Sequence, residues 1–533
     1  MTHFCTPILK TDFPHRIASA LLAIVMGFFL TANSVFAQAS TALPYTADDL
    51  PTGTFFFGAY DNKGQKYGYK RVEYEFFTAD DGKPMFSERS MFVTKFVNLN
   101  RQIRYTSVST MEHFFSVDDG LELAAAQHND KITHASLEDG EPFHTSESRT
   151  MLLRNGNSLH VIRSSNGKDR TWKIPAPGLT AYEFVAGYFL FRSNPSVGDQ
   201  ARFRYIDFDD LSMVEPVLTV EAVNTVSSGN TETLEFACSV EMPVSGVRGE
   251  CTAFESGLMD RVTYQSGWSL IRETESVATD SQTTADFSNI GIVPIDRALP
   301  DPFSLSSIQL KVTGQDAQRM FKDTPNQRVE VISDDHLVIT LKNGVSNYED
   351  PETGDSDNYL MKTPLYAVEH PLIQKKANDL TQDLSTQEEK IARLVAFVDE
   401  HIEDDSDADS EDVIEVFETQ KGDCTEHALL FITLARAAGI PARRVHGYIY
   451  NEDRDSPGFA GHAWAEVLVD GRWTPVDPSW GQSAASIGHL QEYKSAAIPG
   501  AFEIRVIDYK KQHQGPWWPK LMCAYVLGTK RCS

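Results

Sequence analysis

Two hydrophobic patterns follow one another along the chain. From about residue 43 to residue 286, short runs rich in aromatic and β-branched residues are separated by Gly, Asp and Asn turn signals, which predicts antiparallel strands. One helical interruption is expected around residues 180–191. The predicted strands cover residues 54–59, 67–77, 90–97, 159–163, 201–207, 217–226 and 231–240.

The β pattern is interrupted near residues 280–305. Residues 279–284 are polar, and Pro300 and Pro302 break the segment that follows them, so we place a boundary here. Two more strands are expected beyond the boundary, at residues 328–332 and 336–341.

The pattern then becomes helical. Ser385 and Glu388 have the spacing of a capping box at a helix start. The apolar residues that recur at helical spacing are Ile391, Leu394, Val395, Val398 and Ile402. We therefore predict an α+β chain with an antiparallel β-rich N-terminal domain over residues 38–300, a β-rich connecting segment over 301–384, and an α+β domain with a C-terminal tail over 385–533.

Composition and charge limit the classes of function. Apolar residues make up 41% of the 533 residues, which is enough for packed cores and excludes global disorder. The chain holds 48 Lys and Arg against 75 Asp and Glu, a net charge of −27. Such a charge repels phosphate backbones and anionic lipid surfaces, so we expect no nucleic acid partner.

The N-terminus has the pattern of a signal peptide. Lys10 and Arg16 precede an apolar run at residues 17–32, and a Val-Phe-Ala cleavage pattern ends at Ala37. We expect cleavage there, with residues 1–37 removed and the protein exported to a periplasmic or extracellular location. A retained anchor is the alternative, but the run is shorter than the roughly 20 residues of a membrane span. No later stretch is long and apolar enough, so we expect no stable span after cleavage.

Export changes the interpretation of the cysteines, because an oxidising compartment favours disulfides. Cys238 and Cys251 flank a short predicted turn, and Cys523 and Cys532 flank a short C-terminal segment, so each pair closes a local loop. We predict these two disulfides. Five cysteines remain after cleavage, so Cys424 is then left as a free thiol.

An acidic loop follows the predicted helix. Residues 399–412 hold nine carboxylates, and Asp405, Asp407 and Asp409 alternate as in a calcium loop. The match fails at Ser410 and Val416, where glycine and glutamate are required. We predict a solvated loop, with a weak cation site as the alternative.

Cys424 has the setting of a nucleophile. Gly422 and Asp423 introduce a predicted helix that ends at Gly439, so Cys424 lies in its first turn. The unpaired N–H groups and the positive end of the dipole favour the thiolate there. The backbone N–H of Cys424 also faces the negative charge that develops during acyl transfer.

A histidine and a carboxylate are predicted to meet on a nearby hairpin. His462 begins a predicted strand over residues 462–469, which reaches an Asp-Gly turn and returns over 472–477. If the turn has two residues, Asp477 lies opposite Trp464 and diagonal to His462, at a Cβ separation of about 7–8 Å. The two side chains can close that separation with a hydrogen bond, so a His–Asp pair is expected beside the cysteine.

Four motifs in order carry a resemblance to the transglutaminase-like (papain-like) cysteine superfamily. They are residues 422–428 (GDCTEHA), 438–443 (AGIPAR), 462–464 (HAW) and 473–478 (WTPVDP). The resemblance covers roughly residues 385–510 and implies a papain-like α+β fold whose triad is Cys424, His462 and Asp477. A signal peptide and a large β-rich region before this domain also resemble bacterial exported transglutaminase-like proteins.

Alternatives remain open for these residues. Cys424, His427, His446 and His462 have ligand types for zinc, but the last two do not form a second close pair, so we predict no metal. His427 is a rival base because it lies one helical turn from Cys424. Gln420 is a candidate oxyanion donor. Trp464 and Trp473 are candidates for core or cleft walls.

The expected chemistry is acyl transfer. Cys424 attacks a peptide bond or glutamine carboxamide, His462 protonates the leaving amine, and Asp477 orients the imidazole. No cofactor is required, and the expected partner is a protein or peptide substrate. Hydrolysis is favoured because water is the most abundant acceptor. The alternatives are a protein-crosslinking transglutaminase and a catalytically silent scaffold for binding or assembly.

Overall fold

The computed structural model describes residues 45–512 with internal gaps. The predicted signal peptide (residues 1–37), the predicted Cys523–Cys532 disulfide, and Asp407 and Asp409 of the acidic loop lie outside the described residues. The gaps are residues 100–101, 166–167, 209–210, 229–230, 242–247, 265–266, 281–284, 287–291, 315–316, 343–350, 364, 406–409, 411, 452–456 and 493–501.

The N-terminal half is antiparallel β structure, as predicted, and its strands form one large sheet. Its hydrogen-bonded order is β8-β7-β6-β5-β4-β3-β2-β1-β16-β15-β14-β13-β12-β9, and β17 pairs with β3. The strands are β1 (Gly53–Tyr60), β2 (Lys66–Thr78), β3 (Pro84–Asn98), β4 (Ile103–Ser116), β5 (Glu122–Ser136), β6 (Pro142–Asn155), β7 (Ser158–Ser165), β8 (Lys168–Pro175), β9 (Gln200–Arg202), β12 (Val217–Ser228), β13 (Thr231–Glu241), β14 (Arg248–Phe254), β15 (Met259–Tyr264), β16 (Ser269–Glu273) and β17 (Ala285–Asp286).

Short elements complete this half. The helical interruption expected around residues 180–191 is present as two helices that the structure separates at Val185. The remaining elements are the helices α2 (Ala181–Phe184), α3 (Ala186–Arg192) and α4 (Glu275–Ala278), and the paired strands β10 (Tyr205–Ile206) and β11 (Met213–Val214).

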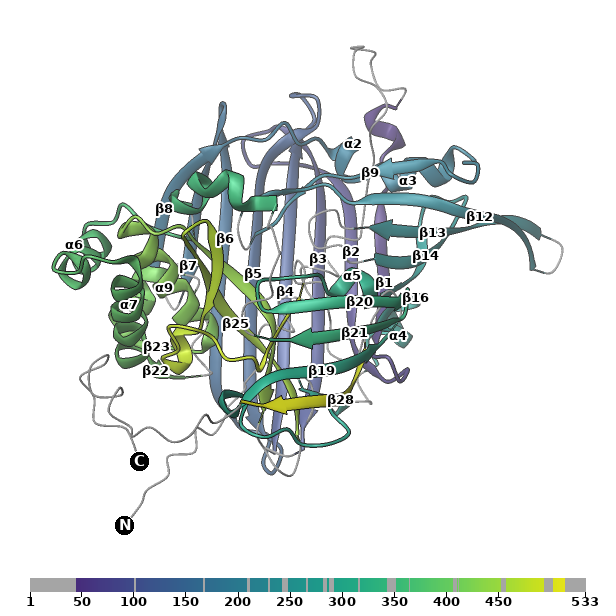
Figure 1. Cartoon of the computed structure of the whole chain (residues 1–533). Coiled ribbons are helices and arrows are strands. Elements are labelled where there is room, and N and C mark those ends of the chain that lie inside the picture. Colours follow the sequence, from purple (N-terminus) through teal and green to yellow (C-terminus); the bar gives the residue numbers. More distant parts are fainter. Residues whose placement is uncertain are drawn as a thin grey trace, which may run out of the picture.

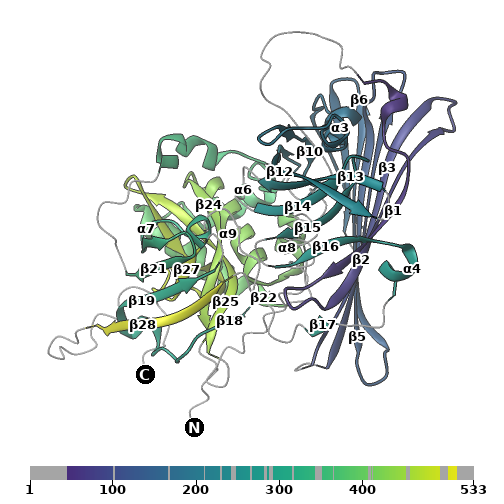
Figure 2. The same ribbon diagram turned by 90° about the vertical axis from the view of Figure 1, so that its right-hand side faces the viewer.

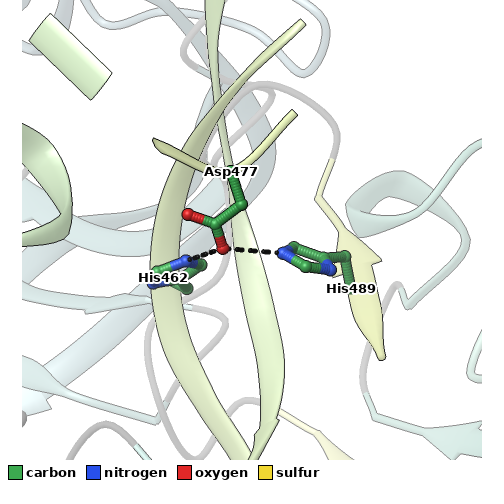
Figure 3. Close-up of side chains that lie close together, drawn as sticks. All are labelled: His462, Asp477 and His489. Carbon is green, nitrogen blue, oxygen red and sulfur yellow. Dashed lines mark hydrogen bonds and ion pairs between the residues drawn. The ribbon is translucent and has the colours of Figure 1, made fainter. Parts of the chain in front are cut away.

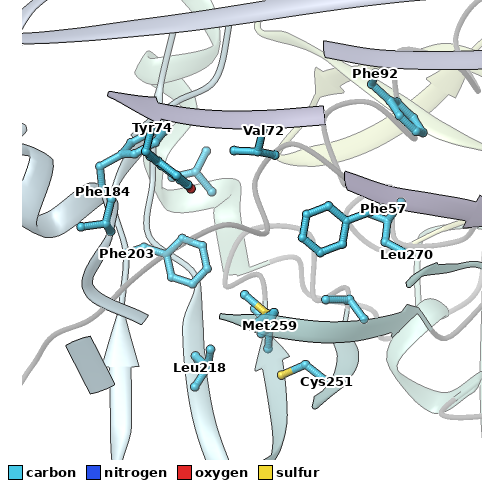
Figure 4. Packing of buried hydrophobic residues seen from close by; sticks show 14 of the residues in the cluster. Phe57, Val72, Tyr74, Phe92, Phe184, Phe203, Leu218, Cys251, Met259 and Leu270 are labelled. Carbon is cyan, nitrogen blue, oxygen red and sulfur yellow. The ribbon is translucent and has the colours of Figure 1, made fainter. Parts of the chain in front are cut away.

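The sheet folds over its own hydrophobic face. In Figure 1 the long strands β2–β8 stand upright, and the later strands β12–β14 run across the view on its right-hand side. Figure 4 shows side chains of the two parts pointing toward one another, with Phe57 and Val72 on one side and Leu218 and Met259 on the other. Within β2, alternate residues such as Val72 and Tyr74 point into this core.

A disulfide joins two neighbouring strands of the sheet. Cys238 on β13 and Cys251 on β14 are directly opposite one another and are bonded. This is the first of the two pairs that the loop argument predicts. Cys424 is a free thiol in the structure.

The C-terminal half contains two smaller sheets and a helical layer. One sheet has the order β18-β25-β24-β27 with β26 paired to β25, and the other has the order β20-β21-β19-β28. The strands are β18 (Ile292–Pro294), β19 (Leu305–Thr313), β20 (Gln327–Ser333), β21 (His336–Leu341), β24 (Ala442–Asn451), β25 (Gly458–Val469), β26 (Arg472–Val476), β27 (His489–Gln491) and β28 (Glu503–Lys511). The described architecture is therefore α+β, as predicted.

Strands within residues 301–384, predicted as a β-rich connecting segment, pair and pack with the C-terminal half. β19 pairs along its length with β28, which lies almost 200 residues later in the chain. The apolar side chains of these strands share one core with Tyr448, Phe459 and Leu490 of the neighbouring sheet. Strand pairing and burial therefore join this segment to the C-terminal half, which the local sequence pattern does not reveal.

Helices α6–α9 cover the sheet beside the predicted nucleophile. The sequence predicts a capping box from Ser385 and Glu388, but the capping box of α7 lies one residue later, at Thr386 and Glu389. The Thr386 hydroxyl accepts a hydrogen bond from the Glu389 N–H. All five predicted apolar positions of that segment are buried. The helices are α5 (Ala317–Met320), α6 (Pro371–Thr381), α7 (Gln387–His401), α8 (Val413–Thr419) and α9 (Cys424–Ala437), with short strands β22 (Glu403–Asp404) and β23 (Lys421–Gly422) between α7 and α9.

The two halves touch through an ion pair. Figure 2 shows the large sheet beside the C-terminal half, with α8 near the sheet. Arg170 of β8 contacts the carboxylate of Asp412, which caps the N-terminus of α8. Among the described residues, no helix has the length and apolar character needed to cross a bilayer.

Candidate active site

Cys424 is the first residue of α9, as its sequence setting predicts. A capping box starts the helix: the Asp423 carboxylate accepts from the Thr425 N–H at 2.7 Å, and the Glu426 carboxylate accepts from the Asp423 N–H at 2.8 Å. The following turns of α9 are buried almost without interruption. Cys424 is itself half-buried, so a rigid helix start presents its thiol at a partly open position.

Position 422, two residues before this helix, requires glycine because a larger side chain would not fit there. A Cβ added to Gly422 would lie 2.3 Å from the Cβ of Glu426. Glu426 is fully buried, so it has no free room to move aside. The absence of a side chain at Gly422 therefore lets Glu426 pack against the backbone and complete the capping box.

The hairpin that carries His462 has the predicted register. Ala465 of β25 faces Val476 of β26, and Val469 faces Arg472 across the Asp-Gly turn. The same register brings Asp477, directly after β26, into hydrogen-bond contact with His462. The Nε2 of His462 lies 2.8 Å from Oδ2 of Asp477 (Figure 3). Both residues are buried.

The imidazole of His462 interacts electrostatically with the thiol of Cys424 as well as with Asp477. Burial alone opposes the positive charge on His462, but the charges of Asp477 and Cys424 and hydrogen bonding by both outweigh it and raise the pKa of His462 to about 10. Since Nε2 is bonded to Asp477, Nδ1 is the ring nitrogen left for Cys424. The geometry therefore suits a thiolate–imidazolium pair.

Asp477 is held as a carboxylate. Burial opposes its charge, but the charge and hydrogen bond of His462 and the hydrogen bond and charge of His489 keep the pKa of Asp477 well below its ordinary value. Its Oδ1 accepts from the Ser479 N–H at 3.1 Å and from the Ser479 hydroxyl at 2.7 Å. Buried charge is tolerated when it is hydrogen-bonded and paired in this way.

His489 is a site residue that sequence reasoning missed. Its Nε2 lies 3.0 Å from the same Oδ2 of Asp477 that His462 contacts (Figure 3). It lies at the start of β27, after a loop in which Asp477 and Gln482 exchange two backbone hydrogen bonds of 2.8 Å. No motif surrounds His489 in the sequence, and its approach depends on the pairing of β27 with β24.

A second glycine makes that approach close. A Cβ at Gly447 of β24 would lie 2.2 Å from the Leu490 carbonyl oxygen of β27 and 2.8 Å from the Trp464 ring. The missing side chain lets β27 lie tightly against β24. It thereby helps to bring His489 within reach of Asp477.

The rival base is tied to its own helix. Nδ1 of His427 lies 2.6 Å from the Asp423 carbonyl oxygen, so this nitrogen carries a proton and donates it. His427 is buried, and the hydrogen bonds that the structure gives for Asp477 do not include it. This geometry favours His462 over His427 as the base.

The structure does not assemble the zinc set considered from the sequence. In the described part of the chain, the His, Cys and carboxylate ligand atoms that gather within 4.8 Å of one another belong to His462, Asp477 and His489. Cys424, His427 and His446 are not members of that group. Its three members are joined by hydrogen bonds instead.

Trp464 and Gln420 have different environments. Trp464 is buried, with its ring centroid 6.0 Å from that of His462 and 5.0 Å from that of His489, so it forms a wall behind the pair. Its indole N–H is buried without a hydrogen-bond partner. Gln420 is exposed and ends α8 in a left-handed conformation, and its role as an oxyanion donor stays a prediction.

Comparison with known proteins assigns the domain that holds this site. Residues 374–478 match the model of the transglutaminase-like superfamily. The chain contains a transglutaminase-like domain. The matched residues include Cys424, His462 and Asp477, and the match begins within α6, before the predicted domain start at residue 385.

Curated relatives share this domain. Kyphoscoliosis peptidase from Homo sapiens is 32% identical over 119 residues, which cover 20% of this chain and 18% of that protein. The Mus musculus protein of the same name is 31% identical over 119 residues, with the same two shares. The chain thus spans less than a fifth of the length of the curated relatives it matches.

Two solved structures align with parts of the chain at low scores. A Cytophaga hutchinsonii protein proposed to be a cysteine protease is 15% identical, covers 40% of this chain and 91% of its own, and has a TM-score of 0.26. A β-barrel-like protein of unknown function from Brucella abortus is 14% identical, covers 41% of this chain and 94% of its own, and has a TM-score of 0.29.

Proposed function

We propose that this protein is a cysteine enzyme that hydrolyses amide bonds in proteins or peptides, with Cys424 as nucleophile, His462 as acid and base, and Asp477 as the residue that orients His462. The observation that carries the proposal is the buried 2.8 Å hydrogen bond between His462 and Asp477, made by a histidine whose pKa is raised by Asp477 and Cys424 against the effect of burial. The transglutaminase-like match over the same residues supports it.

The first half-reaction forms a thioester. The Cys424 thiolate attacks the carbonyl carbon, and the carbonyl electrons move to oxygen, where the N–H groups at the start of α9 stabilise the negative charge. When the C–N bond breaks, Nδ1 of His462 gives its proton to the leaving amine. Asp477 stays ionised and bonded to Nε2, so it holds the ring with Nδ1 toward the sulfur.

The second half-reaction releases the acyl group. A water molecule gives a proton to the now neutral His462 and attacks the thioester carbon, and the Cys424 thiolate leaves as the carboxylic acid forms. A primary amine in place of water gives transamidation. Hydrolysis is the first choice because water is present at far higher concentration than any amine.

One assay separates the reactions. A glutamine-containing protein is incubated with the full chain, with and without a fluorescent primary amine, while released ammonia, new peptide termini and amine incorporation are measured together. We expect hydrolysis to exceed amine incorporation. Dominant incorporation would establish a transglutaminase. Failure of both reactions on a broad panel, together with a Cys424 that iodoacetamide does not alkylate at mildly acidic pH, would favour the scaffold alternative.

Export belongs to the same proposal. The Cys238–Cys251 disulfide supports an oxidising compartment, and the N-terminal pattern of basic residues, apolar run and Val-Phe-Ala supports cleavage after Ala37. N-terminal sequencing of the protein recovered from its source cells is expected to begin at Gln38. Recovery of the intact N-terminus in a cytoplasmic fraction would contradict this part of the proposal.

A further inference from the structure

Two imidazoles share one carboxylate oxygen in this site. Oδ2 of Asp477 lies 2.8 Å from Nε2 of His462 and 3.0 Å from Nε2 of His489. Its other oxygen accepts two hydrogen bonds from Ser479. An ionised carboxylate has about four acceptor positions, so every position on Asp477 is filled and both histidines must donate.

The second nitrogen of His489 also faces an acceptor. Its Nδ1 lies 2.9 Å from the backbone carbonyl oxygen of Ser486, and a carbonyl can only accept. The Ser486 hydroxyl, which accepts from the Gly488 N–H, lies farther from Nδ1, at 3.4 Å. A ring with a carbonyl at one nitrogen and a carboxylate at the other carries a proton on both. The geometry therefore selects the imidazolium form of His489.

We propose that His489 is a positioning residue that, as an imidazolium, shares Asp477 with His462 and sets the pH range in which the Cys424–His462 pair is active. The inference rests on the proposed function, because it assigns His489 a role at the same centre. His489 acts through Asp477, with no contact to the reacting atoms required.

Charge balance supports this role. His462, Asp477 and His489 are all buried, and a buried group of unbalanced charge is costly. With a thiolate at Cys424, two imidazolium rings and one carboxylate, the charges of these four groups sum to zero, and Asp399 of α7 places a further carboxyl group near Asp477. With a neutral His489, the same four groups would carry one net negative charge. The positive charge of His489 thus weakens the hold of Asp477 on the proton of His462, so that His462 can release this proton.

The two rings are close enough for this effect to be measurable. Their centroids are 5.9 Å apart, and like charges at that distance in a protein interior shift each other's titration by about one to two pH units. Trp464 and Trp480 flank His489, with centroids 5.0 and 6.5 Å from its ring. The titratable groups that face it are Asp477 and His462, whereas Glu492 bonds to Tyr448.

Two substitutions separate charge from hydrogen bonding. His489→Gln places an amide that can donate to Asp477 but carries no charge, and His489→Leu removes both. For each folded variant, the rate of Cys424 alkylation by iodoacetamide is measured from pH 4 to pH 10, with the pH profile of hydrolysis beside it. His336→Gln on β21 is the matched control, because it removes an imidazole outside this site.

The expected result is a shift rather than a simple loss. Without the nearby positive charge, Cys424 forms a thiolate, and the His462 imidazolium loses its proton, only at higher pH. His489→Gln should therefore move the pH profile of alkylation upward by about one pH unit. His489→Leu should also lower the rate across the range, since Asp477 loses a donor. An unshifted His489→Gln profile with a reduced rate would mean a purely structural role and overturn the proposal.

A measurement on the unmodified protein covers the case in which the variants do not fold. With ¹⁵N-labelled histidine, NMR of the full chain is expected to find, besides the ring of His462, a second buried imidazole that is protonated on both nitrogens over the pH range in which the protein is active. The absence of a second such ring would overturn the inference. Alkylation and NMR report on the free enzyme, so this outcome is distinct from failure to find a hydrolysed substrate.

Discussion

Replacing Cys424 with alanine is expected to abolish acyl transfer, lowering kcat/KM by at least about 10⁴-fold. The reason is that no other described cysteine is available to form the thioester, because Cys238 and Cys251 are bonded to one another. The rate is measured on a substrate that the wild type cleaves, and trapping of a thioester with a labelled substrate is scored in parallel.

A matched variant tests whether the sulfur itself is required. Cys424→Ser keeps the size and the hydrogen-bonding capacity of the side chain, but a hydroxyl does not ionise near neutral pH, so we expect a loss nearly as large. Both variants should unfold at the same denaturant concentration as the wild type, since Cys424 is only half-buried. Wild-type activity in a folded Cys424→Ala protein would remove Cys424 from the mechanism.

The second large effect is expected at His462. His462→Gln retains a donor for Asp477 but cannot shuttle a proton, so kcat/KM should fall by about 10²–10⁴-fold. The effect should concentrate in kcat rather than KM, because the lost proton transfer belongs to the transition state. Alkylation of Cys424 at mildly acidic pH should slow as well, because the thiolate loses the imidazolium that stabilises it.

His427→Gln is the control that separates the two candidate bases. His427 donates Nδ1–H to the Asp423 carbonyl oxygen and takes no part in the hydrogen bonds of Asp477. The variant should therefore remain within about tenfold of wild-type activity if it folds, which near-UV circular dichroism and an unfolding curve establish. An inactive but folded His427→Gln beside an active His462→Gln would reverse the assignment of the base.

Local patterns in the sequence were sufficient to place Cys424 and to predict the hairpin. The Gly-Asp-Cys start, the apolar helical spacing and the glycine stop lie within one helix, so helix signals alone place Cys424 in its first turn. The Asp-Gly turn sets the register of β25 and β26, and that register brings Asp477 to His462 without information from distant residues. Runs rich in aromatic and β-branched residues between turn signals likewise predicted the strands of the large sheet.

Only the tertiary structure decided which distant residues complete the site and where the halves join. His489 has no motif, and it reaches Asp477 because β27 packs against β24 where Gly447 leaves room. β19 and β28 are far apart in the chain, and their pairing makes the predicted connecting segment part of the C-terminal half. Sequence patterns of short period report which face of an element is apolar. Which elements meet, and therefore which polar side chains share a buried charge, depends on packing between residues that no short pattern links.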